Sequence, residues 1–170
     1  EKTKNYEVCN AGSTDLYIPF FQIAIEMLNE NGMLGYITMN SFLKSLNARE
    51  LRKYFMNDGY NISIVDFRGH QIFSGKSTYT CLFFLKKEKS DMLHYYCDEN
   101  VELRKHFGYT DIPYSMLDAE KGWNLNEYKV AHKLESVGIP LSQFCQSRHG
   151  IATLSNKTCL LYTSDAADER

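Results

Sequence analysis

The stretch ISIVDFRGHQIFSGKSTYTCLFFL, residues 62–85, holds two apolar segments separated by a polar loop that contains glycine. The first segment, residues 62–67, and the last, residues 79–85, are rich in the β-branched and aromatic residues that favour strands. The loop between them is too short to contain a helix that would connect two parallel strands. We therefore expect two strands here, the second of them antiparallel to a neighbour.

Upstream of this stretch, the pattern predicts two helices and one more strand. Apolar residues recur at spacings of three and four from Tyr17 to Leu28, which indicates an amphipathic helix. The run LGYITM, residues 34–39, predicts a buried strand. A second helix is expected after Asn40 and Ser41, whose side chains suit a helix cap, and it should end at Gly59. Its charged positions are expected to face water: Arg49, Glu50, Arg52 and Lys53.

The alternation of helix and strand predicts an α/β fold with parallel strands joined by right-handed crossovers. We expect a loop over residues 1–15 and the α/β segment over residues 16–89. The character of the sequence changes near residue 90, and residues 90–158 mix strand-like pieces, turns and a helix near residues 128–134. This part predicts the start of a mixed α+β domain.

Composition limits the class of protein without choosing a function. Hydrophobic residues make up 44% of the 170 residues and aromatic residues 14%, which is typical of a folded globular chain. The net charge of −2 is not that of a strongly basic nucleic-acid binder, although a local basic patch needs no basic total. The longest apolar run, Cys81 to Leu85, is too short to cross a membrane, and no leader sequence is visible.

Cysteines and histidines predict no metal site. The five cysteines include no pair in CxxC spacing, and the five histidines are isolated from one another and from paired carboxylates. An odd number of unpaired cysteines fits a reducing compartment, so we expect a cytoplasmic protein.

The predicted topology points to one edge of the sheet. Open α/β sheets bind ligands beyond the carboxyl ends of their parallel strands. That edge receives Asn40 and Ser41 after the first strand, and the loop of residues 68–77 after the second. Within the loop, Phe73 is a large aromatic residue among small and polar ones. It either anchors the loop on the sheet or serves as an aromatic platform at the rim of a ligand site.

These residues resemble those of a known family. The series DLYIPFFQIAIEMLNENGMLGYITMNSFL, LRKYF and ISIVDFRGHQIFSGKSTYTCLFFL is similar to adenine-specific DNA methyltransferases of restriction–modification systems that act on the amino group. The likeness is greatest to single-chain enzymes that join a methyltransferase to a target-recognition domain. It covers residues 12–88 and extends loosely to residues 149–157. Two positions depart from the family pattern: Met39, where proline is usual, and Leu154, where glycine is common.

The resemblance implies the carboxyl-terminal half of a Rossmann-like sheet that uses S-adenosyl-L-methionine, followed by the start of the recognition domain. It implies that Phe73 stacks on an adenine flipped out of the duplex, with Asn40 and Ser41 on the same edge. For Asn40 and Ser41, the simpler role of a helix cap stays open. Three cations are candidate contacts to DNA phosphates, or else ordinary solvated side chains: Lys44, Lys76 and Arg148.

The family's Asn-Pro-Pro-Tyr motif, its Gly-rich cofactor loop and its acidic ribose-binding residue do not occur in this sequence. We expect them upstream, so that no catalytic or cofactor-binding residue is assigned here and the fragment alone is inactive. The resemblance implies double-stranded DNA as partner, with a fused or separate endonuclease. Alternatives are a methyltransferase acting on RNA or protein, and a non-catalytic DNA-specificity subunit.

The carboxyl-terminal residues 159–170 are expected not to belong to the natural protein. The segment CLLYTSDAADE, residues 159–169, resembles the translation of a transposon adapter used in sequencing libraries. Such segments are excluded from reasoning about the fold. A natural acidic tail is the alternative interpretation.

Overall fold

The computed structural model describes residues 5–10, 15–75, 78–102 and 108–146. Internal contacts divide the chain into two compact units, residues 1–136 and residues 137–170. Within the second unit, the described part contains a short 3-10 helix, Leu141–Gln143. The five strands and the two helices that cover them belong to the first unit.

Helix α1 spans Tyr17–Met27, close to its predicted range. Its buried side chains recur at three- and four-residue spacings, which is why this segment is helical and lies against the sheet. Asn31 adopts the left-handed φ of 60° expected of an Asn-Gly pair. The helix nevertheless ends earlier, because Leu28 already has an extended backbone.

Helix α2 spans Arg49–Asp58, and its start differs from the prediction. The chain after the first strand forms two 3-10 turns, Asn40–Leu43 and Leu46–Ala48, before the α-helix begins. The prediction that Asn40 caps this helix is wrong, because its side-chain amide donates hydrogen bonds to the end of another strand.

Arg52 was predicted to face water, and that prediction is also wrong. Its side chain is fully buried, and the guanidinium donates to the backbone carbonyls of Phe42, Ser45 and Ala119. These bonds replace most of the hydration of the charge, although the buried Nη2 has no hydrogen-bond partner among the described residues. Arg49 and Lys53 on the same helix keep partly exposed side chains, as predicted.

The sheet contains five strands in the order β1-β3-β2-β4-β5. Strand β3 lies between β1 and β2 and is antiparallel to both, so β1 and β2 run in the same direction. This confirms the directions predicted from the sequence. β4 pairs in parallel with β2, and β5 is antiparallel to β4. The strand bounds are β1 Met33–Met39, β2 Tyr60–Asp66, β3 Thr80–Lys89, β4 Met92–Cys97 and β5 Thr110–Pro113.

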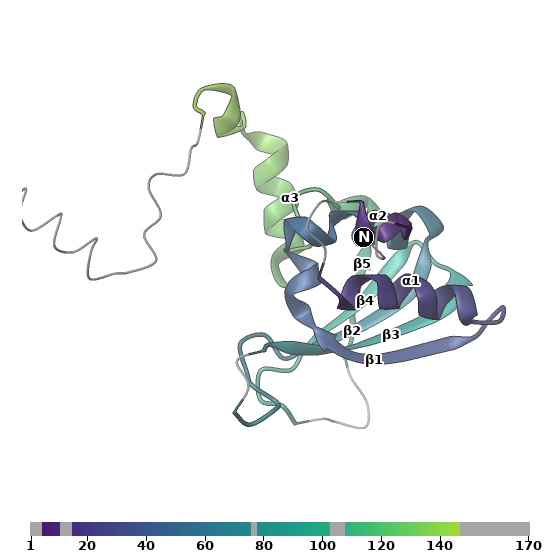
Figure 1. Ribbon diagram of the computed structural model, residues 1–170. Coiled ribbons are helices and arrows are strands. Elements are labelled where there is room, and N and C mark those ends of the chain that lie inside the picture. The colour runs from purple at the N-terminus through teal and green to yellow at the C-terminus, as the bar shows by residue number, and fades with distance from the viewer. Residues whose placement is uncertain (1–4, 11–14, 76–77, 103–107, 147–170) are drawn as a thin grey trace, which may run out of the picture. The chain divides into compact units, whose positions relative to one another are not determined.

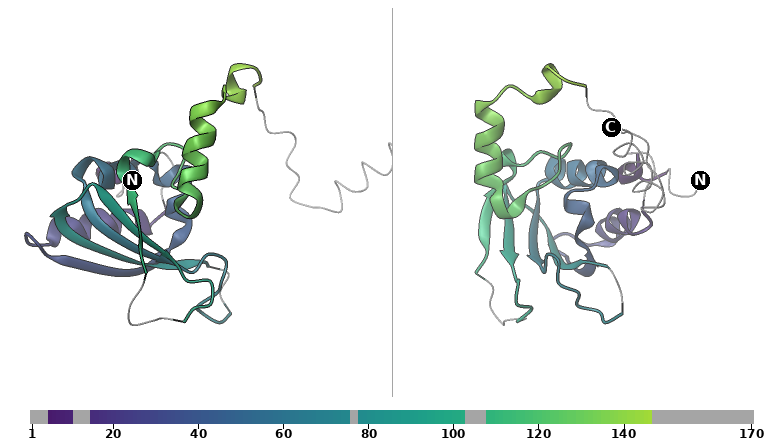
Figure 2. Two further views of the ribbon diagram at one scale, coloured as in Figure 1. Left: turned by 180° about the vertical axis from the view of Figure 1, so that it is seen from behind. Right: turned by 90° about the vertical axis from the view of Figure 1, so that its left-hand side faces the viewer.

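Helices α1 and α2 lie on the same side of the sheet (Figure 1, Figure 2). The core between them and the sheet is aromatic: the Phe21 ring lies 4.9 Å from that of Phe83 and 5.6 Å from those of Phe42 and Phe55, measured between centroids. Edge-to-face contacts of this kind add to the stabilisation from burial. The α/β class predicted from the sequence is confirmed.

Strands β4 and β5 follow residue 90 and still pair within the same sheet. The first compact unit extends to Ser136, and helix α3, Tyr128–Val137, ends where the second unit begins. The predicted boundary between a catalytic part and a recognition part at residue 90 stays a prediction. No helix in the described ranges is long and apolar enough to span a membrane.

Gly59 ends α2 in the left-handed conformation, with φ of 59°, and its amide donates to the carbonyls of Phe55 and Met56. A Cβ at this position would lie 3.1 Å from the carbonyl oxygen of Ser90. We expect Gly59→Ala to lower the free energy of unfolding by about 1 kcal/mol, measured by urea denaturation. Gly69→Ala is the matched control, since a Cβ there has no neighbour within 4 Å. Equal stabilities of the two variants would contradict the prediction.

Candidate functional site

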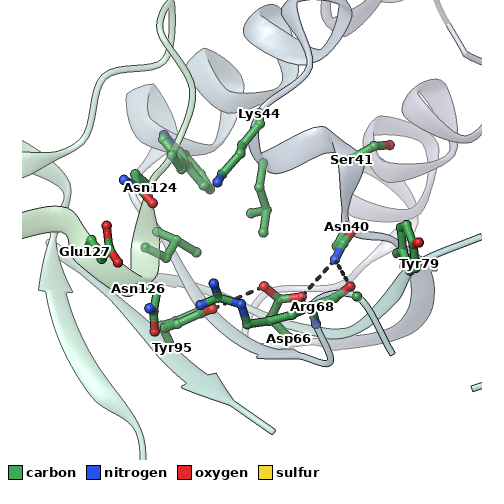
Figure 3. A pocket seen from close by; sticks show the side chains of 14 residues that line it. Asn40, Ser41, Lys44, Asp66, Arg68, Tyr79, Tyr95, Asn124, Asn126 and Glu127 are labelled. Carbon is green, nitrogen blue, oxygen red and sulfur yellow. Dashed lines mark hydrogen bonds between the residues drawn. The ribbon is translucent and has the colours of Figure 1, made fainter. Parts of the chain in front are cut away.

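A cavity of about 460 Å³ lies beyond the carboxyl ends of β1 and β2. Its walls come from the turn of residues 40–44, from residues 66–69, from Tyr79 and Tyr95, and from residues 123–127. We call it the edge pocket (Figure 3). Its position agrees with the general rule that open α/β sheets bind ligands at this edge.

Asp66, the last residue of β2, organises the floor of the edge pocket. Its Oδ1 accepts from the Asn40 side-chain amide at 2.9 Å and from the Arg68 backbone amide at 2.9 Å, while its Oδ2 accepts from the Tyr95 hydroxyl at 3.1 Å. Burial, reinforced by the Asp66 carboxylate, raises the pKa of Tyr95, so that its hydroxyl keeps the proton it donates. These bonds join the ends of β1, β2 and β4.

Asn40 and Ser41, which the sequence predicted at this edge of the sheet, both line the edge pocket, and their role there stays a prediction. The Asn40 amide also donates to the Arg68 carbonyl at 3.0 Å, and thereby holds a residue whose φ of 53° is unusual outside glycine. Ser41 Oγ lies 3.1 Å from the Tyr17 hydroxyl, within hydrogen-bond distance, and so connects the turn to the start of α1.

Lys44 lines the edge pocket with an exposed side chain, and no ion pair joins it to any part of the chain that the structure describes. Two other predicted phosphate contacts, Lys76 and Arg148, lie outside the described residues. Residues 147–170, which include the predicted adapter segment, lie outside them as well.

Phe73 lies in a separate, shallow hollow at the same edge. The hollow is lined by Tyr17, by residues 37–39 at the end of β1, and by Thr78 and Thr80 at the start of β3. The side chain is 47% exposed, so the ring is outside the hydrophobic interior. The backbone amide of Asn40 donates to the Tyr79 carbonyl at 3.1 Å, and this hydrogen bond joins the rims of the two sites.

Several residues of the edge pocket were not predicted. Asp66 carries a local signal, because it is a carboxylate at the end of an apolar strand that leads into the ligand edge. Residues 123–127 carry no such signal, because tertiary contacts bring them here: the Trp123 amide donates to the Leu43 carbonyl at 2.6 Å. No group of three or more His, Cys, Asp or Glu side chains that could hold a metal ion occurs among the described residues.

Comparison with known proteins shows what the first half of the chain resembles. Residues 1–73 match the model of the Eco57I restriction-modification methylase family. The chain is 40% identical over 82 residues to the type II restriction enzyme and methyltransferase RM.Eco57I of Escherichia coli, a match that covers 48% of this chain and 8% of that protein. It is 37% identical over 79 residues to the type II methyltransferase M.BstVI of Geobacillus stearothermophilus, a match that covers 45% of this chain and 14% of that protein.

Solved structures show the same fold. The type IIG restriction endonuclease BpuSI superposes with a TM-score of 0.54 at 15% identity, over 97% of this chain and 24% of that one. The DrdV–DNA complex gives a TM-score of 0.55 at 18% identity, over 72% of this chain and 15% of that one. The family match and the two sequence relatives confirm the predicted resemblance to restriction–modification methyltransferases. The chain spans only a small part of these relatives.

Proposed function

We propose that this chain is part of a site-specific DNA methyltransferase that methylates the exocyclic amino group of an adenine flipped out of the duplex. The observation that carries the proposal is the position of Phe73, half exposed at the carboxyl edge of the sheet, in a chain whose residues 1–73 match a restriction-modification methylase family. A base inside a duplex cannot present its amino group to a methyl donor, so it has to be extruded and held.

Phe73 is proposed to hold the extruded adenine by stacking. Its exposed ring is available for a planar partner, and stacking of a base on an aromatic side chain is worth about 1–3 kcal/mol. Asn40 and Ser41 lie on the same edge, and we propose that they contact the target nucleotide. Lys44, Lys76 and Arg148 are proposed to contact phosphates, which position the DNA without reading its sequence.

S-adenosyl-L-methionine supplies the methyl group when bound. The resemblance assigns its binding residues to motifs that do not occur in these 170 residues, and we assign no described side chain to it. The relatives act, by their names, as methyltransferases and restriction enzymes. We therefore propose double-stranded DNA as the partner, a fused or separate endonuclease, residues 90–158 as the entry to a recognition domain, and a cytoplasmic location.

Methylation by the longer protein that contains this chain tests the proposal. The protein is incubated with duplex DNA and isotopically labelled S-adenosyl-L-methionine, and the DNA is digested to nucleosides. We expect the label in N6-methyladenine. Label in RNA or protein substrates alone would support the alternative methyltransferases, and failure to bind the methyl donor would support a specificity subunit; either result ends the proposal.

A further inference from the structure

The edge pocket has two walls that are far apart in sequence and fixed against each other. The Trp123 amide donates to the Leu43 carbonyl, and Gly122, with φ of 97°, lies so close that a Cβ would come within 3.1 Å of the Leu43 oxygen and of Lys44 Cα. This contact leaves no room for a larger residue at position 122. The backbone contacts between its walls therefore fix the shape of the pocket.

Polar side chains of the edge pocket divide into two groups. The Asp66 carboxylate accepts from the side chains of both Asn40 and Tyr95, and these bonds hold the floor together. The side chains of Asn124, Asn126 and Glu127, which come from the 123–127 wall, make no hydrogen bond or ion pair to any described residue (Figure 3). These two amides and one carboxylate are free to bind a ligand.

The charges in the edge pocket argue against an anionic ligand. Two cations, Lys44 and Arg68, are matched by two carboxylates, Asp66 and Glu127, so the formal charge is zero. A phosphate inside the pocket would face both carboxylates. The remaining free groups combine amide donors with amide and carboxylate acceptors, which suits a neutral ligand that has both donors and acceptors.

Adenine and cytosine meet this description, because each carries an exocyclic amino donor beside an unprotonated ring-nitrogen acceptor. Asparagine pairs with adenine through one donor and one acceptor, and glutamate accepts from the amino group of cytosine. Leu43, Leu125 and Trp123 are the apolar residues of the wall, and they lie almost fully buried behind the polar side chains. The cavity volume of about 460 Å³ is in the range of pockets for small ligands.

We propose that the edge pocket binds a second nucleobase, an adenine or a cytosine, next to the base assigned to Phe73. The proposal rests on the proposed function, since nucleic acid is the source of that base. The two sites adjoin through the hydrogen bond from the Asn40 backbone amide to the Tyr79 carbonyl, and the proposal places one strand in both. Asn124, Asn126 and Glu127 then recognise a base neighbouring the target from within the α/β unit.

Trp123 makes this proposal directly measurable, because it is the only tryptophan of the chain and it lines the edge pocket. The 170-residue chain is titrated with deoxyadenosine, deoxycytidine, thymidine and inorganic phosphate while tryptophan emission is followed. We expect saturable changes with deoxyadenosine and deoxycytidine at concentrations about tenfold lower than with thymidine, which lacks the amino group. Phosphate should give no change.

Asn126→Ala and Glu127→Gln should each reduce this preference about tenfold, and both side chains are exposed, so the fold should persist. Asn57→Ala, on the exposed surface of α2 away from the pocket, is the matched control and should behave as the unmodified chain. The proposal would be overturned if thymidine or phosphate changed the tryptophan emission as deoxyadenosine does, or if no nucleoside gave a saturable change. It would also be overturned if Asn126→Ala and Glu127→Gln kept the preference of the unmodified chain. A nucleoside response combined with no DNA methylation by the longer protein would overturn the proposed function alone.

Discussion

Replacing Phe73 with alanine in the longer protein should lower the rate of DNA methylation about 10- to 100-fold, because the flipped adenine loses a stacking contact worth about 1–3 kcal/mol. Affinity for S-adenosyl-L-methionine should stay nearly unchanged, since no contact to the methyl donor is assigned to this residue. The rate is measured with labelled methyl donor and duplex DNA, and donor affinity by calorimetry. The 47% exposed ring is compatible with this role.

Two further substitutions separate stacking from anchoring of the loop. Phe73→Tyr keeps the aromatic face and should restore most of the activity. Phe73→Leu keeps apolar bulk against Ile37 and Met39 in the hollow but has no face on which a base can stack. If Phe73→Leu were as active as the unmodified protein, Phe73 would be an apolar anchor and the stacking role would be excluded.

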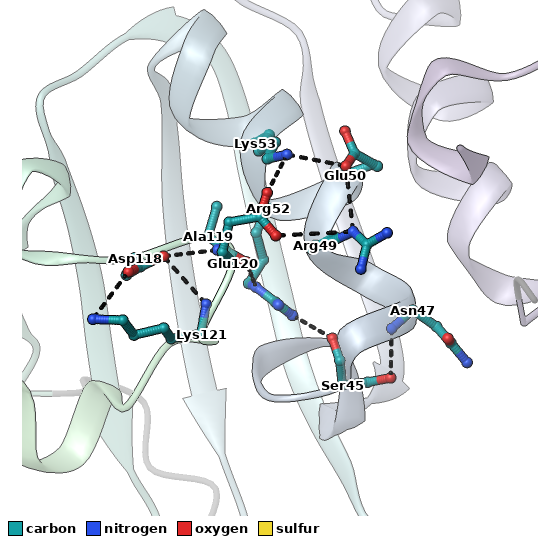
Figure 4. A network of polar contacts seen from close by, with 10 residues as sticks. All are labelled: Ser45, Asn47, Arg49, Glu50, Arg52, Lys53, Asp118, Ala119, Glu120 and Lys121. Carbon is teal, nitrogen blue, oxygen red and sulfur yellow. Dashed lines mark hydrogen bonds and ion pairs between the residues drawn. The ribbon is translucent and has the colours of Figure 1, made fainter. Parts of the chain in front are cut away.

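Arg52→Met should lower the free energy of unfolding by about 3 kcal/mol, the largest stability effect that we predict. The Arg52 Nε donates to the Ala119 carbonyl at 2.9 Å, and its Nη1 donates to the Ser45 carbonyl at 2.8 Å (Figure 4). The Nη1 also donates to the Phe42 carbonyl at 2.6 Å. Methionine fills similar space but leaves these carbonyls without a donor, at about 1 kcal/mol or more each. Urea denaturation of the chain measures the difference.

Arg49→Met on the same helix is the matched control. The Arg49 guanidinium forms long ion pairs with Glu50 at 3.6 Å and Glu120 at 3.9 Å, on side chains that are partly exposed. Such pairs contribute little, so the change should stay within about 0.5 kcal/mol. Similar losses for both variants would show that Arg52 contributes only as a surface charge. The emission of Trp123 should change in Arg52→Met alone, because Arg52 bonds the turn at Phe42 to Ala119, four residues before Trp123.

The sequence predicted those features that depend on local periodicity and on single residues with special backbone preferences. Helix α1, the strands β1 to β3 and the left-handed end at Gly59 follow from apolar spacing and from glycine chemistry, which neighbouring residues alone determine. The antiparallel direction of β3 follows from a loop too short for a crossover. The position of Phe73 at the carboxyl edge follows from the same argument.

Tertiary structure alone decided which polar side chains are buried and with which partners. Arg52 is a charged residue of the kind usually found at the surface. Its burial is possible because the guanidinium donates to the carbonyls of Phe42, Ser45 and Ala119. From the sequence alone, the Asn40 side chain could cap a helix. In the folded chain its amide instead donates to Asp66, which lies at the end of β2. Hydrophobicity along a sequence predicts which face turns inward, but hydrogen-bond partners from distant segments exist only once the chain has folded.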